Sequence, residues 1–337
     1  MGYGDGFLES VERVVQIEQV GLDVVWVPEA YGHDAATRLG FLAGRTQRVE
    51  LASGIFPIYS RTPALLAQTA AGLDEISNGR AILGLGASGP QVIEGWHGVP
   101  YERPAQRTRE IVDICRMVWR RQELRYAGQV LKLPLPADQG TGLGKALKML
   151  SHPVRSRIPI YLASIGDRTV ELTAEVAEGW LPIFFVPEKA ESIWGKALQR
   201  GLQKRAPDLG PLEIVAGGPL AIGEGLEGLR DLARATTALY VGGMGSRNKN
   251  FYNDLVRMYG YEQEARDIQD LYLSGQKQAA EARVPAALLE SLSLIGSEGY
   301  VKDRIAAFQA AGVTLLDLEP IGPNPLEDVA RVKAWVS

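Results

Sequence analysis

The 337-residue chain has very few of the side chains that metal sites and disulfides require. It contains one cysteine, Cys115, and three histidines, and it has neither a CxxC pair nor an HExxH pair. A metal site is therefore not expected. One cysteine cannot form an intrachain disulfide, which suits a reducing compartment. Cys115 shares a helical stripe with Ile111, Ile114 and Val118, which indicates a packed core thiol rather than a nucleophile.

The sequence also lacks long apolar runs and an excess of basic residues. No uninterrupted apolar stretch of about 18 residues occurs, and Met1–Asp5 has neither the basic nor the apolar region of a signal peptide. The formal net charge is −4, with acidic and basic residues interspersed. These absences predict a cytoplasmic protein that binds neither membranes nor nucleic acids.

What the sequence does contain is an alternation of strand and helix patterns. Continuous apolar, β-branched segments such as Asp23–Glu29 are typical of strands buried on both faces. Thr62 and Pro63 supply an N-cap and a first-turn proline for a helix that runs to about Ile76. The expected strands are 23–29, 49–56, 81–85, 158–163, 180–186, 213–222 and 313–319, and the expected helices include 8–20, 35–46, 104–121, 169–178 and 326–335. This order predicts an α/β fold with a parallel sheet and right-handed crossovers.

Two stretches interrupt the alternation, at about 125–153 and 241–285. The first is rich in Gly, Pro and Leu and is expected to cover the downstream ends of the strands. The second is expected to add helices, with Phe251, Leu255 and Met258 on one face. Insertions beyond the downstream strand ends are where barrel enzymes form substrate pockets.

The clearest turn lies in Arg80–Pro90, where a short apolar strand runs into Gly84, Gly86 and Gly89. A backbone with so few side chains indicates that something approaches it closely. The segment fits GxGxxG, but a dinucleotide-binding Rossmann turn opens a helix at once and places an acidic residue about 20 residues later. Here a loop rich in Gly and Pro is expected as far as Pro104, so the Rossmann interpretation is rejected.

Several segments in combination resemble the bacterial luciferase-like monooxygenase superfamily. They are VPEAYG (27–32), SRTPA (60–64), LDEISNGR (73–80) and LGLG (83–86), continued by LGK (143–145), HP (152–153), PIYL (159–162) and GWLP (179–182). The segment ASGPQVIEGW (87–96) looks like the branch of coenzyme F420-dependent oxidoreductases. The resemblance covers nearly the whole chain. It implies one TIM-like (β/α)8 barrel domain over residues 1–337, with the two insertions, that binds a flavin or deazaflavin at its downstream face.

The resemblance assigns the tricyclic ring of the cofactor to the third strand of the barrel. Members of the family carry a bulge there with a non-prolyl cis peptide that backs the ring, and SGIF (53–56) matches it. The cis bond is expected between Gly54 and Ile55, so Ser53, Gly54 and Ile55 are expected to contact the ring. An ordinary strand with a glycine kink is the alternative.

The rest of the cofactor is expected along two further turns. Gly86, Ser88 and Gly89 would lie beside the ribityl chain, where small side chains permit close approach of the backbone. The next strand ends at Ala163 and leads into a helix whose N-terminal amides favour a phosphate. The residues expected at that phosphate are Ala163, Ser164, Gly166 and Arg168. Asp167, as a simple N-cap, would repel it.

The catalytic candidates lie in the turn after the first expected strand. Glu29 aligns with a position that contacts the ring edge in relatives, a surface carboxylate being the alternative. Many relatives carry a catalytic histidine next, whereas this chain has Ala30 there and His33 three positions later. Tyr31 or His33 is expected to donate a proton to the reduced substrate. The residues expected to contact the substrate are Pro57, Tyr59 and Trp96.

The resemblance implies hydride transfer between coenzyme F420 and a small organic substrate, with an FMN-dependent monooxygenase as the alternative. A cofactor that carries the reaction also explains why the chain has so little acid/base machinery of its own. A third interpretation is a degenerate barrel that binds flavin without turnover, because the first barrel strand of relatives is missing before the Gly2-Tyr3 turn. Members of the family are commonly dimers that pack the helices flanking the second and third strands, so a homodimer is expected.

Overall fold

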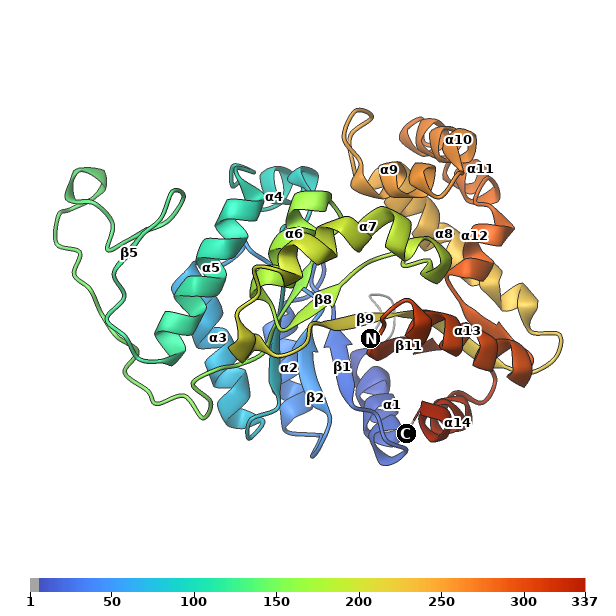
Figure 1. Cartoon of the computed structure of the whole chain (residues 1–337), viewed down its shortest axis with the longest axis horizontal. Coiled ribbons are helices and arrows are strands. Elements are labelled where there is room, and N and C mark those ends of the chain that lie inside the picture. The colour runs from blue at the N-terminus through green and yellow to red at the C-terminus, as the bar shows by residue number, and fades with distance from the viewer. Residues whose placement is uncertain (1–5, 337) are drawn as a thin grey trace. The chain divides into compact units, whose positions relative to one another are not determined.

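Figure 1 shows the computed structural model of the chain, in which residues 6–336 are described. The chain divides into two compact units. The first contains the residues up to Ala163 together with 172–179 and 205–212, and the second contains 164–171, 180–204 and the chain from Glu213 onward. The single barrel domain stays a prediction, and the Gly2-Tyr3 turn, where a first strand was expected to be missing, lies outside the described residues.

The first unit is built on a parallel sheet. Its strands are β1 (Val24–Val27), β2 (Glu50–Ser53), β3 (Phe56–Pro57), β4 (Ala81–Gly86) and β7 (Ile160–Ala163). Strand β1 pairs with β2, β2 with β4, and β4 with β7, while β3 also pairs with β4. All these pairings are parallel, so the downstream ends of the strands meet at one edge. Strand β4 is buried along its whole length, as expected where helices cover both faces of a parallel sheet.

Helices pack this sheet and form the core of the first unit. They are α1 (Phe7–Gln19), α2 (Ala35–Ala43), α3 (Pro63–Ile76), α4 (Pro90–Gly95) and α5 (Pro104–Trp119). The predicted start of α3 is confirmed, since the Thr62 side chain accepts a hydrogen bond from the Leu65 N–H. Helix α4 corrects the sequence analysis, which expected an unbroken loop there. This helix follows Gly89 and ends at Gly95, and its six residues are too few to show a helical period.

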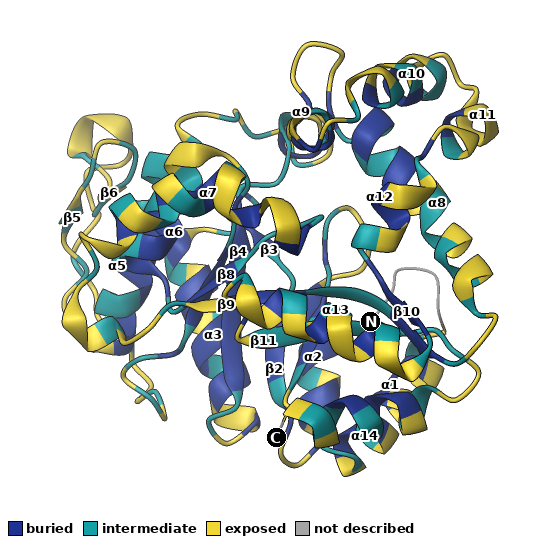
Figure 2. Ribbon diagram, turned by 45° about the vertical axis from the view of Figure 1, so that its right-hand side comes forward, coloured by how far each residue is buried: buried dark blue, intermediate teal, exposed yellow. Residues whose placement is uncertain are grey.

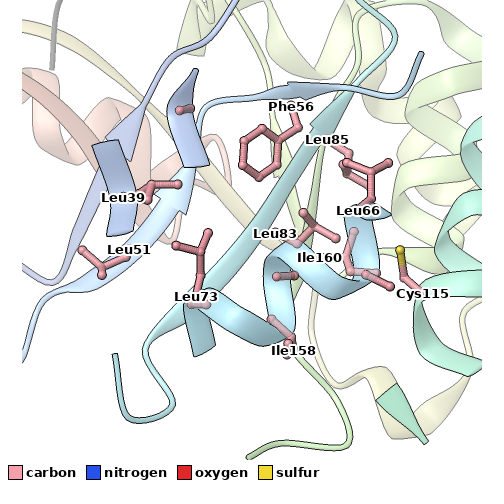
Figure 3. Packing of buried hydrophobic residues seen from close by; sticks show 14 of the residues in the cluster. Leu39, Leu51, Phe56, Leu66, Leu73, Leu83, Leu85, Cys115, Ile158 and Ile160 are labelled. Carbon is pink, nitrogen blue, oxygen red and sulfur yellow. The ribbon is translucent and has the colours of Figure 1, made fainter. Parts of the chain in front are cut away.

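Figure 3 shows the packing of this core, in which Leu83 and Leu85 of β4 meet Leu66 of α3 and Cys115 of α5. The Cys115 side chain is fully buried, which confirms the predicted core thiol. Burial raises the pKa of this thiol to about 12, because a thiolate would lose its hydration there. A neutral, inaccessible sulfur cannot serve as a nucleophile at ordinary pH.

The second unit has its own strands and most of the remaining helices. Strand β9 (Glu213–Ile222) pairs in parallel with β11 (Leu315–Pro320) and, near its end, with β10 (Leu294–Gly296). Strand β10 was not predicted, because three residues are too few to show a period. Its helices are α7 (Pro187–Leu202), α8 (Arg234–Ala238), a π-helical turn (Leu239–Gly243), α9 (Phe251–Met258), α10 (Glu262–Leu273), α11 (Lys277–Ala282), α12 (Ala286–Ser291), α13 (Glu298–Ala310) and α14 (Pro325–Val336).

Helices α9, α10 and α11 confirm the prediction that the second interruption adds helices. Of the face predicted on α9, Leu255 is buried, whereas Phe251 and Met258 are largely exposed. Two of the boundaries between the units fall within α6 (Asp167–Val176) and β8 (Gly179–Leu181), and the others follow Ala163, Lys204 and Leu212. None of the helices within residues 6–336 combines the length and the apolar character that crossing a membrane requires.

The first interruption runs along α5 rather than over the downstream strand ends, which corrects the sequence analysis. It contains the antiparallel pair β5 (Tyr126–Ala127) and β6 (Lys132–Leu133) and extends outward from α5 in Figures 1 and 2. The buried Glu110 of α5 holds its base by accepting hydrogen bonds from the N–H groups of 129, 130 and 131 at 2.7 to 3.2 Å. The Tyr126 hydroxyl lies 3.0 Å from Asp113, one turn further along α5.

We expect Glu110→Gln to lower the free energy of unfolding by about 3 kcal/mol, because one amide oxygen replaces a charged acceptor shared by several donors. Burial alone would raise the pKa of Glu110, but the hydrogen bonds from Gln106 and from the backbone of 129–131 outweigh it and lower the pKa. The carboxylate therefore stabilises the fold above its unfolded pKa of about 4.3, and this contribution is lost as the pH falls through the lower folded pKa. Urea unfolding of both proteins from neutral to acidic pH measures the difference, which should shrink with acid.

Glu123→Gln is the matched control for this prediction. Its carboxylate is 63% exposed and pairs with Arg125 at 3.3 Å, so we expect a change below about 1 kcal/mol. A pH-independent difference between the Glu110 variant and the parent protein would contradict the role assigned to the ionised carboxylate.

Candidate cofactor site

Three turns of the first unit follow neighbouring parallel strands, and they hold most of the predicted cofactor residues. The predicted cis peptide between Gly54 and Ile55 is confirmed and lies between β2 and β3. The Gly54 N–H donates to the Val27 carbonyl at 2.8 Å. The buried Ser53 hydroxyl donates to the Gly84 carbonyl at 2.8 Å and accepts from the Gly84 N–H at 3.0 Å. The Ser53 side chain therefore joins β2 to β4, and its contact with a cofactor stays a prediction.

Small residues bring the ends of β3, β4 and β7 close together. A Cβ atom added to Gly86 would lie 2.9 Å from Ile55 Cδ1 and 3.3 Å from Ala163 Cβ. The Ile58 N–H donates to the Gly86 carbonyl at 2.9 Å, which fixes this approach. The structure thus places the predicted residues Ile55, Gly86 and Ala163 side by side as an apolar surface. Apolar surfaces with few polar groups at their edge are what a planar ring system binds.

Glu29 lies in the turn after β1 as predicted, but its carboxylate is already occupied by protein groups. Glu29 is buried, and its two carboxylate oxygens each accept one hydrogen bond from the Arg61 guanidinium at 2.7 Å. One of these oxygens also accepts the Ala35 N–H at 3.0 Å. A bidentate pair of this kind holds the two turns in a defined relative position.

Arg61 is the residue of this site that the sequence analysis did not single out. Its guanidinium also pairs with Asp34 and lies 4.3 Å from the centre of the Phe56 ring. Burial would lower the pKa of Arg61, but the hydrogen bonds and negative charges of Glu29 and Asp34 outweigh it and raise the pKa. One signal in the sequence could have identified Arg61. It lies directly before the predicted N-cap Thr62, in the loop that follows the expected strand 49–56.

Tyr31 and His33 project from the same turn as Glu29. Ala30 has a φ of 44°, a left-handed conformation that alanine adopts at a cost, and the Gly32 N–H closes the turn on the Glu29 carbonyl at 2.8 Å. Tyr31 is 48% exposed and His33 is also exposed. Within residues 6–336 neither side chain takes part in a hydrogen bond or ion pair, so both remain available to a substrate.

The turn after β4 is held in an unusual conformation by aromatic residues. Ser88 has a φ of 57°, and its carbonyl accepts a hydrogen bond from the Tyr101 hydroxyl at 3.2 Å. The Tyr101 ring packs on Tyr59 with centres 5.2 Å apart, and burial raises the pKa of Tyr101 to about 12. Tyr59 donates its hydroxyl to the Glu102 carbonyl at 2.9 Å.

The three predicted substrate residues therefore differ in their exposure. Tyr59 and Pro57 are buried, and the Tyr59 hydroxyl is committed to the backbone. Trp96, at the end of α4, is 67% exposed. Their contact with substrate stays a prediction, as do the positions of Ser88 and Gly89 beside the ribityl chain.

The predicted phosphate residues after Ala163 belong to the second unit. Two buried indoles fix the backbone there, because Trp180 donates to the Ser164 carbonyl at 3.0 Å and Trp194 to the Ile165 carbonyl at 2.9 Å. The Gly166 carbonyl accepts the first backbone bond of α6, from the Val170 N–H at 2.9 Å. Ser164 is buried, whereas Gly166 is exposed.

The N-terminus of α6 carries charged side chains of both signs. Asp167, which alone would repel a phosphate, forms an ion pair with Arg200 at 2.6 Å. Arg168 is exposed, and no hydrogen bond or ion pair within residues 6–336 engages it. The helix N-terminus adds partial positive charge. Binding of a phosphate by Ser164, Gly166 and Arg168 stays a prediction.

A polar pocket of the second unit involves none of the predicted residues. It is lined by Arg247, Asn248, Asn250, Asn253, Asp254, Arg257, Arg266, Gln269 and Asp270. Each of its three arginines has an acidic partner: Arg247 pairs with Asp270, Arg257 with Asp254 and Glu262, and Arg266 with Glu262. Within residues 6–336 no group of three or more His, Cys, Asp and Glu side chains is placed to hold a metal ion.

The sequence of the chain is similar to that of proteins of a known family. Residues 2–315 match the family model described as luciferase-like monooxygenase. The chain is 38% identical over 324 residues to a protein of Mycobacterium tuberculosis to which coenzyme F420-dependent oxidoreductase activity is provisionally assigned, covering 95% of this chain and 93% of that protein.

Solved structures share the fold. The coenzyme F420-dependent tetrahydromethanopterin reductase of Methanopyrus kandleri matches with a TM-score of 0.80 and 23% identity, covering 98% of this chain and 94% of that chain. An F420-dependent secondary alcohol dehydrogenase in complex with an F420-acetone adduct matches with a TM-score of 0.77 and 16% identity, covering 99% of this chain. These similarities support a parallel α/β fold of the TIM-like type.

Proposed function

The chain belongs to the luciferase-like monooxygenase family, and we propose that it is an oxidoreductase that transfers hydride between coenzyme F420 and a small organic substrate. The observation that carries this proposal is the apolar surface of Ile55, Gly86 and Ala163 beside the cis Gly54–Ile55 peptide. The 38% identical relative provisionally assigned as F420-dependent supports the choice of cofactor.

The residues of the first unit fit a planar deazaflavin ring. Because Gly86 has no side chain, Ile55 and Ala163 pack closely against it, and the three residues together offer a planar ring an apolar surface. When bound, the cofactor would supply or accept the hydride. The three turns then orient the ring, while Tyr31 or His33, which are exposed beside Glu29, would move the proton that accompanies substrate reduction.

Glu29 would contribute to this site mainly by holding the backbone of its turn in place. Because both of its oxygens already bind Arg61, its carboxylate is poorly placed to take up a proton during turnover. It holds the backbone of the turn that carries Tyr31 and His33. Ser164, Gly166 and Arg168 would hold the phosphate of the cofactor tail.

The test is a titration of the purified protein with coenzyme F420 and, separately, with FMN, followed by cofactor fluorescence at equal ionic strength. We expect F420 to bind at least about tenfold more tightly than FMN. Arg168→Gln should weaken F420 binding by about tenfold, because a charge-assisted bond to the phosphate is lost, and should not affect the same deazaflavin without its phosphate-bearing tail. Lys196→Gln, an exposed charge on α7, is the control.

Two alternative functions predict other results of this titration. The family description names monooxygenases, so preference for FMN would favour an oxygen-activating enzyme instead. Binding of F420 without turnover on any hydride acceptor would favour a degenerate barrel. Binding of neither cofactor would overturn the proposal.

The homodimer and the cytoplasmic location are part of this proposal. The second and third barrel strands of the resemblance correspond to β1 and to β2 with β3. Large apolar side chains on the helices that follow them support a packed partner, since Phe41 of α2 is 42% exposed and Leu65 and Ile76 of α3 are 47% and 57% exposed. Single exposed apolar residues are ordinary, but neighbouring ones mark interaction surfaces.

A further inference from the structure

The polar pocket of the second unit is lined by the loop before α9, by α9 itself and by α10. These two helices lie side by side in Figures 1 and 2. The pocket has a volume of about 400 Å³, which is within the range of sites that bind small molecules. None of the predicted cofactor or substrate residues lines it, so the proposed function does not account for it.

A π-helical turn, Leu239–Gly243, fixes one amide side chain of this pocket. Such turns are rare and often occur at functional sites. Asn253 of α9 is only 5% exposed, and its Nδ2 donates to the Val241 carbonyl of the turn at 3.1 Å and to the Ala265 carbonyl at 2.7 Å. Because both N–H groups of the amide are used, its orientation is determined, and its oxygen Oδ1 is turned away from these carbonyls.

Two well-buried side chains of the pocket each have a carbonyl oxygen without a donor. Gln269 of α10 is 7% exposed, and its Nε2 donates to the Ser246 carbonyl at 3.3 Å. In the part of the chain that the structure describes, no group donates to Gln269 Oε1 or to Asn253 Oδ1. Polar groups of buried residues are normally satisfied by protein, water or a ligand. The pocket therefore offers two acceptors to a molecule that carries N–H groups.

The charged groups of the pocket are balanced in sign. Its three arginines are matched by three carboxylates, those of Asp254, Asp270 and Glu262. The members of these pairs are between 39% and 61% exposed. Ion pairs this exposed contribute little, so a ligand carboxylate can replace a protein carboxylate at small cost. A ligand with one charge of each sign matches such a pocket better than an anion or a cation.

We propose that this pocket binds a small zwitterion of the α-amino acid class. The ammonium group of the ligand would donate to the amide oxygens of Asn253 and Gln269, which have no other donor. Its carboxylate would accept hydrogen bonds from the arginines, whose planar guanidinium groups suit a carboxylate. The inference goes beyond the proposed function and does not depend on which cofactor the protein binds.

The test is a calorimetric titration of the full chain with each of the common L-α-amino acids. We expect at least one of them to bind with a Kd below about 1 mM. The N,N,N-trimethyl derivative of that amino acid keeps both charges but has no N–H group, so it should bind at least about tenfold more weakly. The proposal would be overturned if no amino acid bound this tightly, or if the derivative lost less affinity than this.

Gln269→Met removes the acceptor Oε1 while it keeps the length of the side chain. It should weaken binding of the amino acid at least about tenfold and should not change the affinity for the trimethyl derivative, which cannot donate to Oε1. Gln263→Met is the matched control, because Gln263 is an exposed residue of the same helix and does not line the pocket. Equal loss in both variants, or no loss in the Gln269 variant, would contradict the assignment.

Hydrogen exchange of the parent protein locates the ligand without any substitution, should the Gln269 variant fold poorly. Saturation with the amino acid should slow exchange of the backbone N–H groups in 246–257 and 262–270, the segments that carry the pocket. Slower exchange only in other segments would place the amino acid elsewhere and overturn the proposal. Addition of coenzyme F420 is not needed for this result, so it stands or fails apart from the proposed function.

Discussion

Arg61→Met should lower the free energy of unfolding by about 3–5 kcal/mol, because it leaves the buried Glu29 carboxylate without its counter-charge. The side chains of this pair are only 12% and 8% exposed, so water cannot replace the guanidinium. Methionine is an unbranched side chain that keeps much of the bulk of arginine beside the Phe56 ring, which limits the loss of packing while the charge is removed. Urea unfolding at neutral pH measures the change.

Two further variants test whether the loss of stability in Arg61→Met comes from the unpaired Glu29 carboxylate. Arg45→Met is the matched control, because Arg45 and Glu12 form a pair that is 41% and 57% exposed and should contribute less than about 1 kcal/mol. Adding Glu29→Gln to Arg61→Met should recover part of the stability, since a neutral amide can still accept the Ala35 N–H. A loss no larger than that of Arg45→Met would show that the pair does not hold the two turns together.

Gly84→Ala is expected to be more damaging than its size suggests, with a cost above about 4 kcal/mol. A Cβ atom at Gly84 would lie 1.8 Å from the carbonyl oxygen of Ser53, so β2 and β4 would have to separate. This approach positions the Gly54–Ile55 peptide relative to Gly86. Thermal and urea unfolding measure the effect, and loss of folded protein would count as the expected result only if the control behaves normally.

The control for that prediction is Gly299→Ala, where the added Cβ atom would meet nothing within 4 Å in helix α13. Alanine should there increase stability by up to about 1 kcal/mol, because it restricts the unfolded chain. Ser53→Ala gives a milder test of the same contact. It removes both hydrogen bonds of the Ser53 hydroxyl with Gly84 and should cost about 2 kcal/mol. A Gly84 variant as stable as the parent would contradict the close packing of the two strands.

Local chemistry made several features predictable. The N-cap and proline that begin α3 act within one turn of helix, so four residues are enough to specify them. The helical stripe that includes Cys115 is likewise a local period. The cis peptide after Gly54 was predicted from a family resemblance, not from such rules, and the structure contains it.

Other features depend on contacts between residues far apart in the chain. Arg61 meets Glu29 across 32 positions, so no spacing pattern in the sequence could reveal the pair. The course of the first interruption, 125–153, was predicted wrongly for the same reason. Its length and composition suggested a cover for the strand ends, but Glu110 of α5 binds the backbone at 129–131 and Asp74 of α3 binds Arg155, just after the segment.

The sequence by itself determined the alternation of strands and helices, the buried character of the sheet and the family of the protein, because these depend on periodicity and local motifs. Only the tertiary structure decided which groups meet. It brought Ile55, Gly86 and Ala163 into one surface, paired Glu29 with Arg61, and left the leucines of residues 134–154 exposed. The physical reason is that hydrogen bonds and packing depend on distance in space, which the order of residues does not specify.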